Sequence, residues 1–164
     1  MSTDPTYQTA GDRIGQIFSD LDDAGIEFPG EVQHTATILA RVVGDPDVEW
    51  SRGKRPGGIA TSCIYVADFA VRGENRLTQT KLCKHAPATP PTVREQYRVI
   101  PGIFIDNVDQ EMLHRVPDNI KARLNMFRAA VDSGVGITNV DPDANDYTDF
   151  QYLANAVLDV QETA

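Results

Sequence analysis

The apolar residues in the first half of the chain recur every three or four positions, which is the spacing of one face of an α-helix. Residues 12–24 and 31–43 both show this pattern, and a glycine follows each stretch, as is typical of a helix end. Residues 57–72 are apolar almost all round, which indicates a buried central helix. No alternating run of apolar and polar residues has a useful length, so we expect an all-α protein.

Two shorter helices are predicted after this central one. Thr78 is suited to be the N-cap of the first, and Thr89 the N-cap of the second, which Pro101-Gly102 is expected to end. An Ala-Pro-Ala break separates the two. Two short helices joined by a tight turn after a long buried helix are typical of a helix-turn-helix, here at about residues 78–100.

The C-terminal part is less regular. Residues 107–115 and 118–132 are predicted as helices, 133–147 as a loop and 148–160 as a last amphipathic helix. An apolar stripe on the helix 118–132 is of a kind that usually packs on its own domain, but it also suits a homodimer seam; it consists of Ile120, Leu124, Phe127 and Val131. We expect a disordered N-terminus (1–10), a helical domain (11–102) and an acidic helical C-terminal extension (103–164).

The charge balance at first argues against a nucleic-acid partner. The chain of 164 residues fits one domain, and its 24 acidic and 15 basic residues give a net charge of −9, whereas nucleic-acid-binding domains tend to be basic. The charge is unevenly spread, however. Residues 1–51 carry a net −8, residues 52–98 a net +6 and residues 99–164 a net −7. The basic middle coincides with the predicted helix-turn-helix, so the total charge does not exclude DNA binding.

Two further features of the composition bear on where the protein works. Asp outnumbers Glu by 17 to 7 and Arg outnumbers Lys by 11 to 4, which is typical of a surface that stays hydrated in strong salt, so we expect a halophilic source. The N-terminus lacks the basic start and apolar core of a signal peptide, and no apolar run approaches the roughly 18 residues of a membrane span. We therefore expect a cytoplasmic protein with no membrane partner.

A helix-turn-helix places the first residues of its second helix against base edges in the major groove. The candidates for base contact are Thr89, Pro91, Thr92, Val93 and Arg94, of which Arg94 suits a guanine or a phosphate and Thr92 and Val93 a thymine methyl. The candidates for phosphate contact on the same unit are Lys81, Lys84 and Arg98. An ordinary helix pair with a solvated basic face remains the alternative.

Residues 52–100 resemble the cyclin-like repeat of the archaeal and eukaryotic transcription factor B (TFIIB) family. The resemblance depends on three motifs, namely Arg55-Pro56-Gly57-Gly58-Ile59-Ala60 continuing to Ile64-Tyr65-Val66-Ala67, then Leu77-Thr78-Gln79, then Thr92-Val93-Arg94-Glu95-Gln96-Tyr97-Arg98. It covers roughly residues 11–102 as one five-helix cyclin-like domain, similar to the second repeat of the family.

The resemblance implies a function. The second repeat of the family reads a promoter element beside the TATA box through its helix-turn-helix, in contact with the TATA-binding protein. It implies that Arg94 touches bases and that Arg52, Lys54 and Arg55 approach the DNA backbone. Pro91 replaces an apolar side chain that touches a base in the family, which puts the ancestral sequence preference in doubt.

The departures from the family limit this interpretation. The family engages RNA polymerase through an N-terminal zinc ribbon, which needs four Cys or His ligands. Residues 1–50 offer only His34, so we do not expect a ribbon or this mode of polymerase contact here. We expect a DNA-binding transcription factor or regulator, associated with the nucleoid, with no enzymatic activity, cofactor or metal. The alternative is a cyclin-like protein–protein interaction module that binds the TATA-binding protein or RNA polymerase, with little or no DNA binding.

Overall fold

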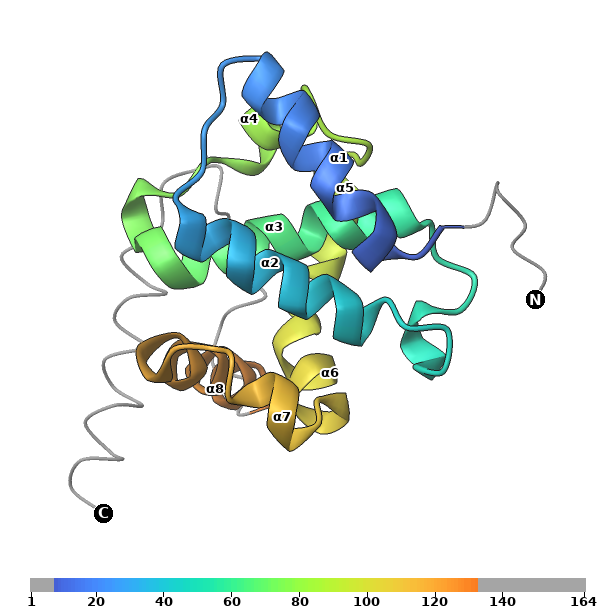
Figure 1. The fold of residues 1–164 in the computed structure, drawn as a ribbon, viewed down its shortest axis with the longest axis vertical. Coiled ribbons are helices and arrows are strands. Elements are labelled where there is room, and N and C mark those ends of the chain that lie inside the picture. The colour runs from blue at the N-terminus through green and yellow to red at the C-terminus, as the bar shows by residue number, and fades with distance from the viewer. Residues whose placement is uncertain (1–7, 133–164) are drawn as a thin grey trace.

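A computed structural model describes residues 8–132, and every regular element in this range is helical. The three long N-terminal helices are α1 (Ala10–Asp23), α2 (Gly30–Val43) and α3 (Pro56–Arg72), and they pack on one another (Figure 1). The prediction of an all-α protein is therefore confirmed for the described residues. No helix among them is long and apolar enough to cross a membrane.

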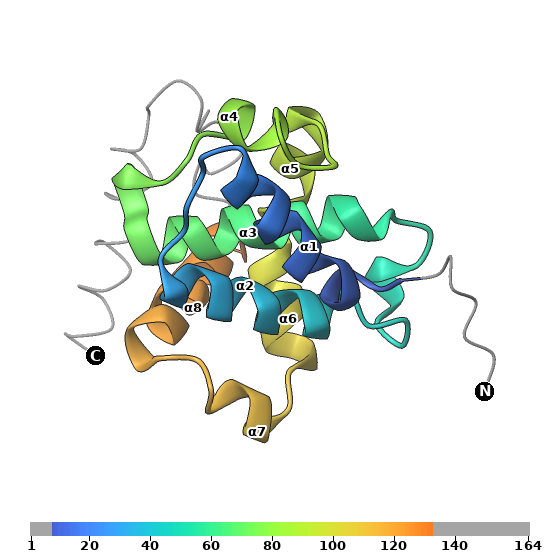
Figure 2. The same ribbon diagram turned by 45° about the horizontal axis from the view of Figure 1, so that its top comes forward.

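Helix α3 is the central element, as its unbroken apolar pattern predicts. Its side chains are buried continuously from Gly57 to Ala70, because α1 and α2 cover one side and α5, α6 and α8 pack against the rest (Figure 2). Pro56 occupies the first turn, where its missing N–H removes no helix hydrogen bond. Short 3₁₀ turns precede and follow α3 at Glu49–Ser51 and Gly73–Asn75.

The next two helices are α4 (Gln79–Cys83) and α5 (Pro90–Gln96). The Thr78 hydroxyl accepts a hydrogen bond from the backbone N–H of Lys81, which confirms the predicted N-cap. The predicted end of α5 is wrong. Pro101-Gly102 does not end this helix but lies in the first turn of α6 (Ile100–Asn107), a position that proline favours because its N–H would have no partner there.

The C-terminal part of the described chain shares the core of the rest. Helix α7 (Gln110–Leu113) leads to α8 (Asp118–Asp132), and α6 crosses the domain boundary expected at residues 102/103. Ile120, Leu124 and Phe127 are buried in the same apolar cluster as the side chains of α3. These three side chains are therefore used within the chain and are not available for the homodimer seam considered above.

The N-terminus of the domain begins earlier than expected. Thr9 and Asp12 form a capping box at the start of α1, in which each side chain accepts a hydrogen bond from the other residue's backbone N–H. Ala10 is buried, so residues 8–10 belong to the fold rather than to the disordered segment 1–10 that the sequence predicted. Residues 1–7, the expected loop 133–147 and the expected helix 148–160 lie outside the described residues.

Candidate nucleic-acid interface

The short helices α4 and α5, with the turn between them, form a unit (residues 78–96, the α4–α5 unit) that packs on α3. Val93 and Gln96 are the buried residues of α5 and face inward. The Ser62 hydroxyl of α3 donates a buried hydrogen bond of 2.9 Å to the side-chain carbonyl of Gln96. A satisfied polar contact in a low-dielectric interior is directional, so it fixes the rotation of α5 on α3.

A second set of contacts holds the segment that enters α4. The Asp68 carboxylate of α3, which is almost fully buried, accepts both guanidinium hydrogen bonds of Arg72 and a 2.8 Å hydrogen bond from the backbone N–H of Leu77. Nearby, Arg76 donates to the Tyr65 hydroxyl at 3.0 Å. The chain is thus tied to α3 immediately before the Thr78 cap.

Aromatic side chains also pack between α3 and the end of the α4–α5 unit. The Tyr65 ring packs edge-to-face on Phe69 and on Tyr97. Burial raises the pKa of the Tyr65 hydroxyl, although the charge of Arg76 partly opposes this shift. Burial likewise raises the pKa of the Cys63 thiol, which keeps it protonated at neutral pH. These groups of α3 therefore act as packing and hydrogen-bonding residues beneath the α4–α5 unit.

Two glycines at the start of α3 allow the α4–α5 unit to come close. A Cβ on Gly57 would lie 3.0 Å from Cγ of Pro87, in the turn between α4 and α5, and a Cβ on Gly58 would lie 3.5 Å from the Thr92 methyl. Gly57 comes two residues after the segment of residues 52–55 (the basic loop), which carries three cationic side chains. The close approach therefore places the start of α3, which the basic loop enters at Pro56, next to the turn and the start of α5.

The outward face of α5 carries most of the residues expected to meet bases. Thr89, Pro91 and Arg94 are exposed, and Thr92 is half-buried with its hydroxyl 3.1 Å from that of Thr89. The interpretation of Val93 requires correction: it is fully buried against the core, so it packs the helix and cannot reach a base. Glu95 is also exposed and places one negative charge on this helix.

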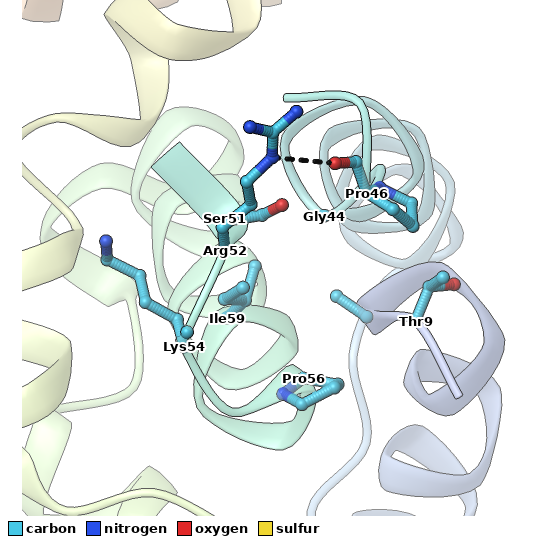
Figure 3. A pocket seen from close by; sticks show the side chains of 10 residues that line it. Thr9, Gly44, Pro46, Ser51, Arg52, Lys54, Pro56 and Ile59 are labelled. Atoms are coloured by element: carbon cyan, nitrogen blue, oxygen red, sulfur yellow. Dashed lines mark hydrogen bonds between the residues drawn. The ribbon is translucent and has the colours of Figure 1, made fainter. Parts of the chain in front are cut away.

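The basic loop is exposed and internally braced. The Arg52 Nε donates to the Pro46 carbonyl at 3.4 Å (Figure 3). The Lys54 amine donates to the Trp50 carbonyl at 2.6 Å and lies 4.7 Å from the Trp50 ring centre. Arg55 is exposed at the N-cap of α3. These contacts order the loop while its charges stay accessible to a large anionic partner.

An open pocket of about 280 Å³ lies between the start of α1, the end of α2 and the basic loop (Figure 3). Ser51 is its most buried polar lining residue, and its hydroxyl is hydrogen-bonded at 2.8 Å to the carbonyls of Asp45 and Val48. The Ser51 hydroxyl therefore already has hydrogen-bond partners, and these bonds stabilise the loop that lines the pocket.

The remaining cations are placed on the α4 side and at the end of the α4–α5 unit. Lys81 and Lys84 are exposed at α4, and Arg98 is half-buried just after α5. In both views the α4–α5 unit lies at the end of the molecule opposite α7 (Figures 1 and 2). Among residues 8–132, no group of His, Cys, Asp or Glu side chains has the arrangement of a metal site.

One residue of this region is not suggested by the sequence. Arg13 belongs to the acidic N-terminal segment, yet its Nη1 atom lies 3.1 Å from the position of a Cβ on Gly57, beside the Pro87 turn. The only signal in the sequence is that Arg13 is the single basic residue of α1. Its position results from the packing of α1 on α3, which the helical periodicity does not reveal.

Comparison with known proteins adds no relative: no family model, curated protein or solved structure matches the chain. The function proposed below is therefore inferred from the residues and their geometry.

Proposed function

We propose that this protein is a DNA-binding transcription factor or regulator, in which a cyclin-like domain reads promoter DNA with the α4–α5 unit as its helix-turn-helix. The observation that carries the proposal is the close approach at Gly57 and Gly58. It supports a continuous cationic surface in which the basic loop and the exposed face of α5 meet one duplex. In a helix-turn-helix the recognition helix usually contacts the bases, while flanking residues contact the phosphates.

Base recognition is assigned to the first turns of α5. Arg94 is exposed, and its guanidinium suits the two acceptors of a guanine in the major groove. Thr89, Pro91 and Thr92 precede it on the accessible side or edge of the helix. Pro91 has no donor or acceptor beyond its carbonyl, so it contributes shape and apolar contact only.

Phosphate contacts are assigned to the exposed or partly exposed cations around α5, which fix the position of the helix without reading sequence. The cations are Arg52, Lys54, Arg55, Lys81, Lys84 and Arg98.

The TATA-binding protein, whose contact the family resemblance implies, is the expected protein partner on the promoter.

The test is selection of bound duplexes from a random pool by the wild-type full chain and by Arg94→Ala. The wild type should enrich a short consensus. Arg94→Ala should lose preference at one or two base pairs, at a cost of about 1–3 kcal/mol in discrimination. Enrichment of no consensus by the wild type, or an unchanged consensus with Arg94→Ala, contradicts the proposed recognition.

Glu95 supports a second candidate function. A carboxylate exposed beside Arg94 gives α5 mixed charge, which suits a protein partner better than a phosphate backbone. In this alternative the cyclin-like domain binds the basal transcription machinery directly. Capture of the TATA-binding protein or RNA polymerase by the full chain without DNA, together with failure to enrich any duplex, would favour it.

A further inference from the structure

Arg13 occupies an unusual position in the charge pattern of the molecule. Helix α1 otherwise carries only acidic charges, and Arg13 is the one base among them. Its side chain is half-buried and extends across the start of α3, so that Nη1 comes within 3.1 Å of the Cβ position of Gly57. A guanidinium is therefore held at the point where α1 meets the central helix.

The same point is also the meeting place of the α4–α5 turn. The Pro87 ring lies 3.0 Å from the Cβ position of Gly57, so Arg13 and Pro87 flank one glycine. Pro87 is exposed, and Arg55, two residues before Gly57, is exposed as well. Three segments that are far apart in the sequence thus meet at Gly57, and Arg13 lies there beside the turn of the proposed helix-turn-helix.

Within residues 8–132, the Arg13 guanidinium has no ion pair and no hydrogen-bond acceptor. A half-buried cation has lost part of its hydration, and an anion that reaches it restores the lost interaction. The planar guanidinium fork matches two oxygens of a phosphate. Packing alone does not explain an arginine here, because any long side chain would cover the same surface.

We propose that Arg13 binds a phosphate of the DNA backbone beside the α4–α5 turn, which extends the interface from the basic residues of segment 52–98 onto α1. The inference rests on the proposed function, since it requires a duplex seated on α5. It assigns Arg13 a contact that positions the DNA and reads no sequence. The acidic helix α1 thereby takes part in DNA binding through its single basic residue.

The change that tests this is Arg13→Gln in the full chain, with binding to fluorescein-labelled duplexes measured by anisotropy over a salt series. Loss of one phosphate contact should weaken binding about eightfold at 0.1 M salt and make the log–log salt slope shallower by about 0.9. Two duplexes of different sequence should lose affinity by the same factor. Circular dichroism at each salt concentration measures the folded fraction of Arg13→Gln, and the slopes are compared only where both proteins are folded, which separates unfolding from the lost contact.

Two further variants serve as controls. Arg115→Gln removes an arginine that is 54% exposed, is paired with Glu111 at 3.6 Å and follows α7, the helix that lies opposite the α4–α5 unit (Figures 1 and 2); affinity and slope should not change. Arg13→Lys keeps the charge and should restore the slope, with part of the affinity lost because an ammonium lacks the planar fork. An Arg13→Gln slope equal to that of the wild type, or a loss that differs between the two sequences, overturns the inference while the proposed function stands. Absence of wild-type binding to any duplex overturns both.

Discussion

The buried ion pair beneath the α4–α5 unit predicts a large and specific loss of stability for Asp68→Ala. The Asp68 side chain is 2% exposed and that of Arg72 is 27% exposed, and the carboxylate also accepts the Leu77 backbone N–H. The substitution removes three charge-assisted hydrogen bonds and leaves Arg72 partly buried without its partner. Each such bond contributes about 1.5–3 kcal/mol and breaking a buried pair costs about 3–5 kcal/mol, so we expect a loss of about 4 kcal/mol.

The assay is urea unfolding of the full chain followed by circular dichroism. With a slope of about 2 kcal/mol/M, a loss of about 4 kcal/mol lowers the midpoint by about 2 M. The matched control is Asp106→Ala, which breaks a 2.8 Å ion pair to Arg128 whose side chains are 58% and 35% exposed. A pair with this exposure contributes at most about 1 kcal/mol, and its contribution should fade in high salt while that of Asp68 persists. Equal effects of the two substitutions would refute the reasoning.

Three other changes test separate parts of the structure. Gly44→Ala should lower the melting temperature, at a cost of about 1–3 kcal/mol, because the added Cβ would lie 2.6 Å from that of Ala10; an unchanged melting temperature contradicts this contact. Phe127→Ala removes a ring packed 5.1 Å from Phe69 and should destabilise a single cooperative unfolding transition by about 3–5 kcal/mol; a separate early transition would show that α8 unfolds independently. Glu95→Gln should raise DNA affinity about threefold at low salt, since it removes one charge that repels phosphates; weaker binding would contradict the placement of α5 against DNA.

Much of the helical structure follows from local pattern. The stretches 12–24 and 31–43 lie in α1 and α2, and the wholly apolar stretch 57–72 is the central helix α3. The Thr78 cap is likewise correct, because a cap depends on residues three positions apart. Such features need no knowledge of the rest of the fold.

What the sequence did not predict depends on contacts between distant segments. Proline both ends and begins helices, so the sequence alone did not decide that Pro101 begins α6. The burial of Val93 follows from how α5 is rotated on α3, which the buried bond between Ser62 and Gln96 fixes. The approach of Arg13 to Pro87 at Gly57 is a tertiary contact with no local signature.

These contacts show where the basic residues of the chain lie in the fold. The basic segment 52–98 comprises the basic loop, α3 and the α4–α5 unit, and the start of α3 meets the turn of that unit where a Cβ on Gly57 would lie 3.0 Å from Pro87. The net charge of −9 is then carried mainly by the flanking segments, so it describes the solvation of the protein more than the surface proposed to meet DNA.

The most direct test of the proposed function is the salt dependence of duplex binding by the full chain. Six phosphate contacts from the basic segment and one from Arg13 give an upper limit of about −6 for the slope of log K against log salt. Measurable binding is expected at the lowest salt concentration at which circular dichroism shows the chain folded, with a linear fall of slope between about −4 and −6 as the salt concentration rises. A slope near zero, or no binding by the folded chain at that salt concentration, contradicts the proposal that this surface binds DNA.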